Sequence, residues 1–183
     1  MNTVDHADLA RRLGEAALLR GEFVLRSGRK SSYYLDKYRF STQPGVLREL
    51  GRLFRERIEL VAKESGPIQR LAGAELGGIP LVTAASLETG LPSLFVRNSK
   101  KDYGTSKQLE GVIEAGDRVV MVEDVATTGG QALEAVEVLK AAGAEVVRVI
   151  CTIDREEGAR ENFDKAGVGF EALFTKGDLG IRE

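Results

Sequence analysis

The sequence predicts an α/β protein with a central parallel sheet flanked by helices, and two observations support this prediction. Continuous apolar runs, such as Val119–Val122 and Val146–Ile153, are typical of strands that are buried on both faces. Helical segments separate these runs, and this alternation favours parallel strands joined by helical crossovers. A sheet of this kind binds its ligands at the carboxyl ends of its strands.

The N-terminal part of the chain is expected to combine helices with short strands. Residues Asp5–Arg20 carry their apolar side chains on one helical face and are expected to form an amphipathic helix. Short strands are expected at Phe23–Leu25 and Tyr33–Tyr38, on either side of a turn at Ser27–Arg29. Pro44 is expected to open a second helix, because proline is favoured in the first helical turn.

The rest of the chain alternates strands and helices, interrupted by one long polar loop. The expected strands are Ile68–Ala72, Ser93–Val96, Val119–Val122, Val146–Ile153 and Phe170–Phe174, the expected helices are Ile79–Glu88, Gln131–Ala142 and Glu156–Ala166, and the loop is Arg97–Glu110. A loop of this length without regular structure is usually functional or disordered.

Composition excludes several classes of site and partner. The chain has 183 residues and a net charge of −2, so we expect a single domain, residues 1–183, and no nucleic acid as a partner. The single cysteine, Cys151, excludes an intrachain disulfide, and the single histidine, His6, excludes histidine triads and multi-histidine metal sites. No apolar run approaches the roughly 18 residues of a membrane helix, and no secretion signal is recognisable, so a cytoplasmic protein is expected.

The most informative stretch is RVVMVEDVATTGGQ, residues 118–131, in which an apolar strand leads into two acids and then a Thr/Gly turn. Glycines and a helix N-terminus suit a phosphate monoester, because backbone N–H groups can approach it closely. The acids Glu123 and Asp124 would repel a phosphate, so ribose hydroxyls are their expected partners. The alternative is a surface turn with capping threonines. A Rossmann nucleotide site is disfavoured, because G-x-G-x-x-G is absent.

The stretch VVMVEDVATTGG resembles the PRPP-binding signature of type I phosphoribosyltransferases, where PRPP is phosphoribosyl diphosphate. Three further stretches narrow the resemblance to orotate phosphoribosyltransferases: FVLRSGRKSSYYLD (23–36), VRNSKKDYGTSKQLEG (96–111) and TIDREEGA (152–159). The resemblance implies the type I phosphoribosyltransferase fold, with a small N-terminal hood formed by residues 1–40 and the C-terminal segment. It also implies transfer of a phosphoribosyl group from PRPP to orotate, with Mg²⁺ as cofactor, in a homodimer with shared active sites.

The same resemblance implies the site residues. PRPP contacts are expected from Arg97, Lys101, Tyr103, Glu123, Asp124, Val125, Ala126, Thr127, Thr128, Gly129, Gly130 and Gln131, orotate contacts from Arg26, Tyr33, Tyr34, Thr127 and Arg155, and catalytic roles from Lys101, Glu123 and Asp124. Mg²⁺ is expected to be held mainly by PRPP and water rather than directly by protein side chains.

Two of these roles have alternatives. Arg155 suits the orotate carboxylate because a guanidinium binds it bidentately, but an ion pair with Glu156 or Glu157 is the ordinary alternative. Tyr33 and Tyr34 are neighbours on a strand and face opposite ways, so one of them is expected only to pack.

The sequence departs from the family pattern at three cationic positions. Asn98 and Tyr103 stand where lysine and histidine are frequent, and no lysine is present near Gly77, where many members carry one. The resemblance also implies a non-proline cis peptide bond at Glu75–Leu76. Two other functions remain open: transfer to another base, and PRPP binding by a regulator without catalysis.

Overall fold

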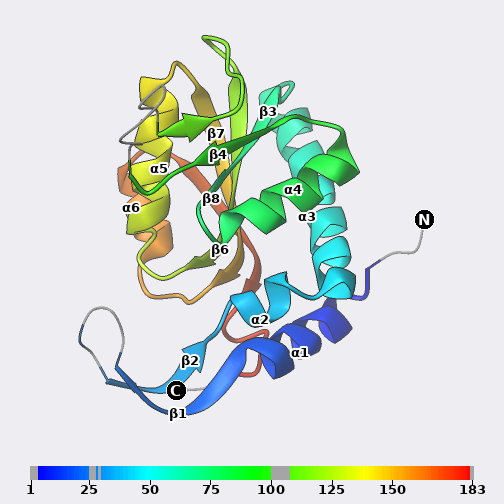
Figure 1. Cartoon of the computed structure of the whole chain (residues 1–183), viewed down its shortest axis with the longest axis vertical. Helices are drawn as coiled ribbons and strands as arrows, with labels where there is room; N and C mark the ends of the chain where they lie inside the picture. Colours follow the sequence, from blue (N-terminus) through cyan, green and yellow to red (C-terminus); the bar gives the residue numbers. More distant parts are fainter. Residues whose placement is uncertain (1–3, 25–27, 29, 100–107, 182–183) are drawn as a thin grey trace.

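The computed structural model describes residues 4–24, 28, 30–99 and 108–181 (Figure 1). The helices are α1 (His6–Ala17), α2 (Tyr38–Ser41), α3 (Pro44–Ser65), α4 (Gly78–Thr89), α5 (Gly130–Ala141) and α6 (Ala159–Lys165). The strands are β1 (Leu18–Val24), β2 (Lys30–Leu35), β3 (Arg70–Ala74), β4 (Ser93–Val96), β5 (Leu109–Glu110), β6 (Arg118–Ala126), β7 (Glu145–Asp154) and β8 (Gly169–Thr175). None of the helices described is long and apolar enough to cross a membrane.

The central sheet confirms the predicted α/β class. Its six strands lie in the order β5-β4-β3-β6-β7-β8. Neighbours from β4 to β8 run parallel, and β5 pairs antiparallel with β4 at the edge. The chain moves outward from β3 to β4 and returns to the other side of β3 with β6, so the strand order reverses between β3 and β6. In doubly wound sheets ligands bind at this reversal, beyond the carboxyl ends of the strands.

Two apolar cores lie on the two faces of the sheet. Val120 and Val122 of β6 belong to the core that α3 and α4 cover, together with buried residues of α1 and α2. Val119 and Met121 belong to the core that α5 and α6 cover, which also contains Cys151. This alternation follows from the period of two along a strand. In Figure 1, α3 and α4 accordingly lie on one side of the strands and α5 and α6 on the other.

The start of the chain differs from the prediction. The first helix ends at Ala17 rather than Arg20, because Leu18 begins a strand whose register pairs it with Leu35 of β2. The predicted strand Tyr33–Tyr38 likewise stops at Leu35, since Tyr38 begins α2. Pairing between β1 and β2 thus overrides a local sequence that suits a helix.

The last helix also differs from the prediction, because α6 begins at Ala159 rather than at Glu156. The Asp154 carboxylate accepts the backbone N–H of Glu156 at 2.8 Å and forms a turn there. Gly158 then takes a φ of 100°, which a continuous α-helix does not allow. The helix start at Pro44 and the strand Ser93–Val96 are confirmed.

The elements α1, β1, β2 and α2 form a layer at one end of the sheet, here called the hood (Figure 1). His6 joins the hood to β8: its Nε2 lies 2.9 Å from Leu173 O, and its ring stacks on Phe174 with centroids 4.2 Å apart. The C-terminal segment packs closely on α1, since a Cβ at Gly14 would lie 2.8 Å from Leu179 O.

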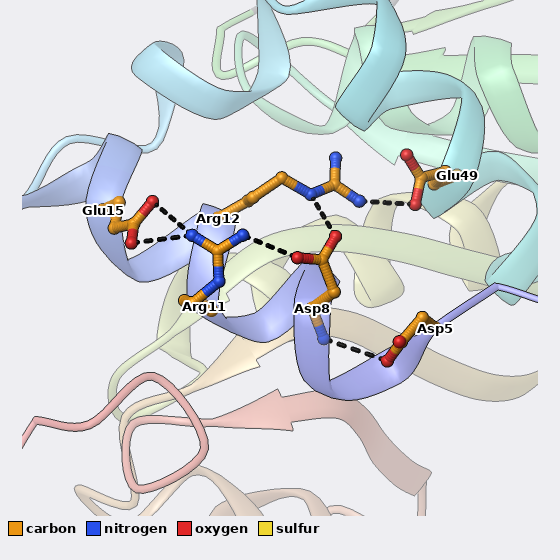
Figure 2. Close-up of polar contacts among 6 residues, drawn as sticks. All are labelled: Asp5, Asp8, Arg11, Arg12, Glu15 and Glu49. Carbon is orange, nitrogen blue, oxygen red and sulfur yellow. Dashed lines mark hydrogen bonds and ion pairs between the residues drawn. The ribbon is translucent and has the colours of Figure 1, made fainter.

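Charged side chains on α1 form a hydrogen-bonded network that also reaches α3 (Figure 2). Asp8 accepts Nη2 of Arg11 at 2.6 Å and Nε of Arg12 at 2.7 Å. Arg11 also donates to Glu15, one turn along the same helix, at 2.8 Å. Arg12 instead donates to Glu49 of α3 at 2.6 Å. Arg12 therefore joins the hood to α3, whereas Arg11 connects residues of α1 alone.

We expect Arg12→Met to destabilise the protein by about 1 kcal/mol, and Arg11→Met to change its stability much less. The two variants remove the same charge from neighbouring positions, but only Arg12 bridges two helices. Thermal unfolding at low and high salt measures the difference, which should shrink as salt screens the network. Equal losses in the two variants would show that the bridge to Glu49 does not secure the hood.

Candidate active site

The acid pair Glu123 and Asp124 lies inside β6, rather than after the strand as predicted. The strand continues because Val125 and Ala126 still pair with β7. Both acids are buried, with 7% of Glu123 and 1% of Asp124 exposed. They lie near the carboxyl end of β6, beside the point where the strand order reverses.

The two acids have different surroundings. Glu123 Oε2 is buried and has no hydrogen-bond partner among the residues that the structure describes. Such an oxygen can accept a hydrogen bond from a hydroxyl group of a ligand. Asp124 is covered by the loop after β3, since a Cβ at Gly77 would lie 1.6 Å from Asp124 Oδ2. Any side chain larger than hydrogen at position 77 would require Asp124 to move.

Lys37 of the hood extends to this pair, and its Nζ lies 2.7 Å from Asp124 Oδ2. Burial opposes the charge on Lys37, but the charge and hydrogen bond of Asp124 outweigh burial and raise the pKa of Lys37. Burial and the neighbouring Asp124 carboxylate raise the pKa of Glu123 well above its ordinary value. Glu123 therefore keeps its proton to a higher pH than an exposed glutamate does.

The predicted phosphate loop, Ala126–Gly130, runs from the last residue of β6 to the first residue of α5. Gly129 has a φ of 75°, and a Cβ there would lie 2.6 Å from Cε2 of Phe163, so this position requires glycine. Asn162 Nδ2 of α6 donates to Thr128 O at 2.9 Å and ties the loop to the next helix. The N-terminal N–H groups of α5 and its dipole make this turn suitable for a phosphate.

The loops after β3 and β4 are linked to the start of α5. The predicted cis peptide bond between Glu75 and Leu76 is present. Glu75 Oε1 accepts the backbone N–H of Asn98 at 2.7 Å, and Asn98 Oδ1 accepts Nε2 of Gln131 at 3.0 Å. Asn98, which stands where lysine is frequent in the resembling family, thus connects two loops of the site.

Arg155 directly follows β7 and is 8% exposed. Its Nη2 lies 3.1 Å from the Tyr33 hydroxyl, and its guanidinium carbon lies 5.2 Å from the centroid of the Tyr33 ring. Its backbone N–H donates to Ala126 O at 2.9 Å, so Arg155 lies beside the end of β6. Nη2 also pairs with Glu157 Oε1 at 2.8 Å, which is one of the two ion pairs considered as alternatives.

Other predicted residues are not brought to this cluster by the contacts described. Tyr34 faces away from Tyr33, as predicted for strand neighbours; it is 43% exposed, and its ring lies 5.7 Å from Phe23. Arg97 lies at the start of the polar loop, with Nη1 3.8 Å from Glu110 Oε1. Arg26, Lys101 and Tyr103 lie outside the described residues.

Lys37 is the site residue that the sequence did not reveal. It follows a short strand far from the acids in sequence, and only the folded hood brings it to Asp124. Within the described part of the chain, no group of three or more His, Cys, Asp or Glu side chains is placed to hold a metal ion.

The chain is similar in sequence and in fold to known phosphoribosyltransferases. The family model for the phosphoribosyl transferase domain matches residues 39–176. The chain is 48% identical over 159 residues to the orotate phosphoribosyltransferase of Natronomonas pharaonis, covering 87% of each chain. The crystal structure of Mycobacterium tuberculosis H37Rv orotate phosphoribosyltransferase in complex with Fe(III) dicitrate is 33% identical, with a TM-score of 0.84 over 97% of this chain and 100% of that chain. The corresponding complex with PRPP is 32% identical, with a TM-score of 0.80 and the same coverage.

We expect Glu123→Gln to raise the melting temperature by a few degrees at neutral pH, because glutamine cannot acquire the charge that burial beside Asp124 opposes. The raised pKa means that the folded wild type holds this proton more tightly than the unfolded chain. The contribution of Glu123 to the stability of the wild type is therefore fully present below the ordinary pKa of 4.5. This contribution is lost as pH rises from 4.5 through the raised pKa of the folded state.

Thermal unfolding across pH tests this expectation. The advantage of Glu123→Gln should grow as pH rises above 4.5 and disappear under more acidic conditions. Glu134→Gln is the matched control, since Glu134 is exposed on α5. An advantage that does not change with pH would contradict the assignment.

Proposed function

We propose that this chain, which belongs to the orotate phosphoribosyltransferase family, transfers the 5-phosphoribosyl group of PRPP to orotate. The products are orotidine 5'-monophosphate and diphosphate, a step of UMP biosynthesis. We also propose that it acts in the cytoplasm as one catalytic domain with its hood, where Cys151 stays a free thiol.

The observation that carries this proposal is that an acid pair, a Thr/Gly turn at a helix N-terminus and a buried guanidinium group lie together at the carboxyl end of β6. Val125 and Ala126 separate the acids from the turn, and Arg155 donates its backbone N–H to Ala126 O at the end of the same strand. These groups fit a substrate that carries ribose hydroxyls, a phosphate and a carboxylate-bearing ring. A helix N-terminus suits the phosphate, and a guanidinium suits the carboxylate.

The reaction is displacement at ribose C1: the orotate ring nitrogen bonds to C1, and diphosphate leaves with the electrons of the broken C–O bond. Because that nitrogen can already be anionic, the chain has little proton transfer to perform and acts mainly by positioning and charge. Glu123 and Asp124 hold the ribose hydroxyls, and Ala126–Gly130 holds the 5-phosphate. Arg97, Lys101 and Tyr103 are proposed contacts of PRPP, and Arg26, Tyr33 and Arg155 of orotate.

Mg²⁺ is part of this proposal and is carried mainly by oxygens of PRPP and by water. The donor set supports this role, because Asp124 is already paired with Lys37 and only Glu123 Oε2 is left buried without a partner among the described atoms of the pair. When bound, Mg²⁺ neutralises charge that gathers on the departing diphosphate.

The test of this function is turnover with PRPP, Mg²⁺ and one of four bases. We expect consumption of orotate and not of uracil, hypoxanthine or adenine. Uracil lacks the carboxylate that Arg155 is proposed to bind, and for this reason uracil should not react. Arg155→Ala removes the partner of the orotate carboxylate and should raise the KM for orotate by about tenfold or more, with little change in the KM for PRPP. Arg155→Lys keeps the charge but not the bidentate geometry, so its KM for orotate should lie between those of the wild type and Arg155→Ala.

Three other outcomes are informative. Equal losses for orotate and PRPP in Arg155→Ala would remove the proposed role of Arg155. Turnover of another base in place of orotate would assign a different phosphoribosyltransferase. PRPP binding without turnover of any base would favour a regulator.

We further propose a two-fold homodimer in which the loop Arg97–Glu110 reaches the active site of the partner subunit. An apolar groove of about 450 Å³ between α3 and α4 supports this, because Leu47, Pro80 and Leu87 line it. Leu87 is 82% exposed and adds apolar surface to this groove. In a symmetric dimer, a second copy of the chain would cover this groove.

Subunit complementation tests the shared site. Asp124→Asn and Lys101→Ala proteins should each be nearly inactive alone, and mixing them should restore activity. In a mixed dimer, one site inherits both defects and the other inherits neither, so half of its sites should work. If subunit exchange is demonstrated and activity does not return, each loop serves its own subunit.

A further inference from the structure

Lys37 is held over the acid pair by the backbone of the hood. The residue lies between β2 and α2, where Asp36 N donates to Ala17 O at 2.9 Å and Ser41 N donates to Lys37 O at 3.2 Å. These bonds fix the Lys37 backbone against the end of α1. The side chain then crosses from the hood to the sheet and ends 2.7 Å from Asp124 Oδ2.

This ion pair occupies an atom that the proposed substrate needs. Asp124 Oδ1 accepts the backbone N–H of Val125 at 2.5 Å, whereas Oδ2 accepts no backbone N–H among the described contacts and is the more available oxygen for a ribose hydroxyl. Lys37 Nζ lies 2.7 Å from that oxygen. A hydroxyl that binds there must share the oxygen with the Lys37 ammonium or displace it.

The surroundings of the ion pair also allow Lys37 to move away from Asp124. The Asp124 side chain is 2% exposed, whereas the Lys37 side chain is 31% exposed, so part of the Lys37 side chain reaches solvent. Lysine carries its charge on a flexible four-carbon stem and can move by a change of rotamer. Burial disfavours an unpaired ammonium, so Lys37 leaves Asp124 only for another anion.

Gly77 explains why this cation comes from the hood. A Cβ at position 77 would lie 1.6 Å from Asp124 Oδ2, so the carboxylate oxygen fills the volume that a side chain would need. The loop after β3 therefore covers Asp124 without supplying a charge from this position. Lys37 is the cation that the described residues place on Asp124, and it reaches the acid from the hood.

We propose that Lys37 is a PRPP-binding residue, whose ammonium moves from Asp124 to an oxygen of the diphosphate when the ribose hydroxyls occupy Asp124. This inference rests on the proposed function, because it requires ribose hydroxyls at the acid pair. In PRPP the diphosphate on C1 is adjacent to the hydroxyl on C2, so an ammonium beside the acid pair is within a rotamer change of the diphosphate. The exchange replaces one charge-assisted hydrogen bond with another.

Binding of two ligands without orotate tests this exchange, since no turnover then occurs. Ribose 5-phosphate offers the hydroxyls and the 5-phosphate, and PRPP adds the diphosphate. Calorimetry in Mg²⁺ should show that Lys37→Met weakens PRPP binding by about tenfold or more and leaves ribose 5-phosphate binding equal or tighter. Lys37→Arg, which keeps the charge, should recover much of the PRPP affinity.

Lys140→Met is the matched control, because Lys140 also pairs with a carboxylate, Glu137, but lies in the last turn of α5. It should bind both ligands like the wild type. Circular dichroism checks the fold of each variant, and Lys37→Gln replaces Lys37→Met if the latter does not fold.

The remaining outcomes overturn the inference. Equal weakening for both ligands would mean that Lys37 acts only by positioning Asp124. Wild-type affinity of Lys37→Met for PRPP would leave Lys37 as a structural ion pair. If the wild type itself neither turns over orotate nor binds PRPP, the proposed function is rejected. The behaviour of the wild type therefore distinguishes failure of the proposed function from failure of the inference about Lys37.

Discussion

Two adjacent carboxylates buried near the carboxyl end of β6 are the constraint on which the rest of the site depends. Burial and the neighbouring Asp124 carboxylate oppose ionisation of Glu123 and raise its pKa, and the Lys37 ammonium beside Asp124 partly offsets this effect. Because Lys37 belongs to the hood, the contacts of His6 with β8 and of Arg12 with α3 also help to place that charge. The hood is therefore an electrostatic component of the site as well as its cover.

The reversal of strand order between β3 and β6 brings loops together, and polar contacts hold them in a fixed arrangement. Asn98 connects Glu75 after β3 to Gln131 at the start of α5. Asn162 holds the carbonyl of Thr128. Surface loops are generally mobile, so such ties allow a site built on loops to present its donors in one geometry.

The sequence predicted the features that local patterns determine, and missed those that depend on distant contacts. Continuous apolar runs predict the buried strands of the sheet, and the acid pair with its Thr/Gly turn lies at the carboxyl end of β6. The local pattern predicts a helix at Leu18, because the pairing of Leu18 with Leu35 has no local signal. Lys37 was missed for the same reason, since its partner Asp124 lies 87 positions later in the sequence. The resemblance and the chemistry of a guanidinium agree on Arg155 as an orotate contact, which stays a prediction, whereas its contact with Tyr33 is visible only in the folded chain.

Cys151, the single cysteine of the sequence, is fully enclosed in the core beneath α5 and α6. Burial, reinforced by the nearby Asp154 and Glu123 carboxylates, raises the pKa of this thiol well above its ordinary value. Only a thiolate that reagents can reach is alkylated or forms mixed disulfides at a useful rate. Cys151 is therefore unreactive towards thiol-directed dyes in the folded protein. A cysteine introduced on the surface would carry a fluorophore or spin label without background labelling of Cys151.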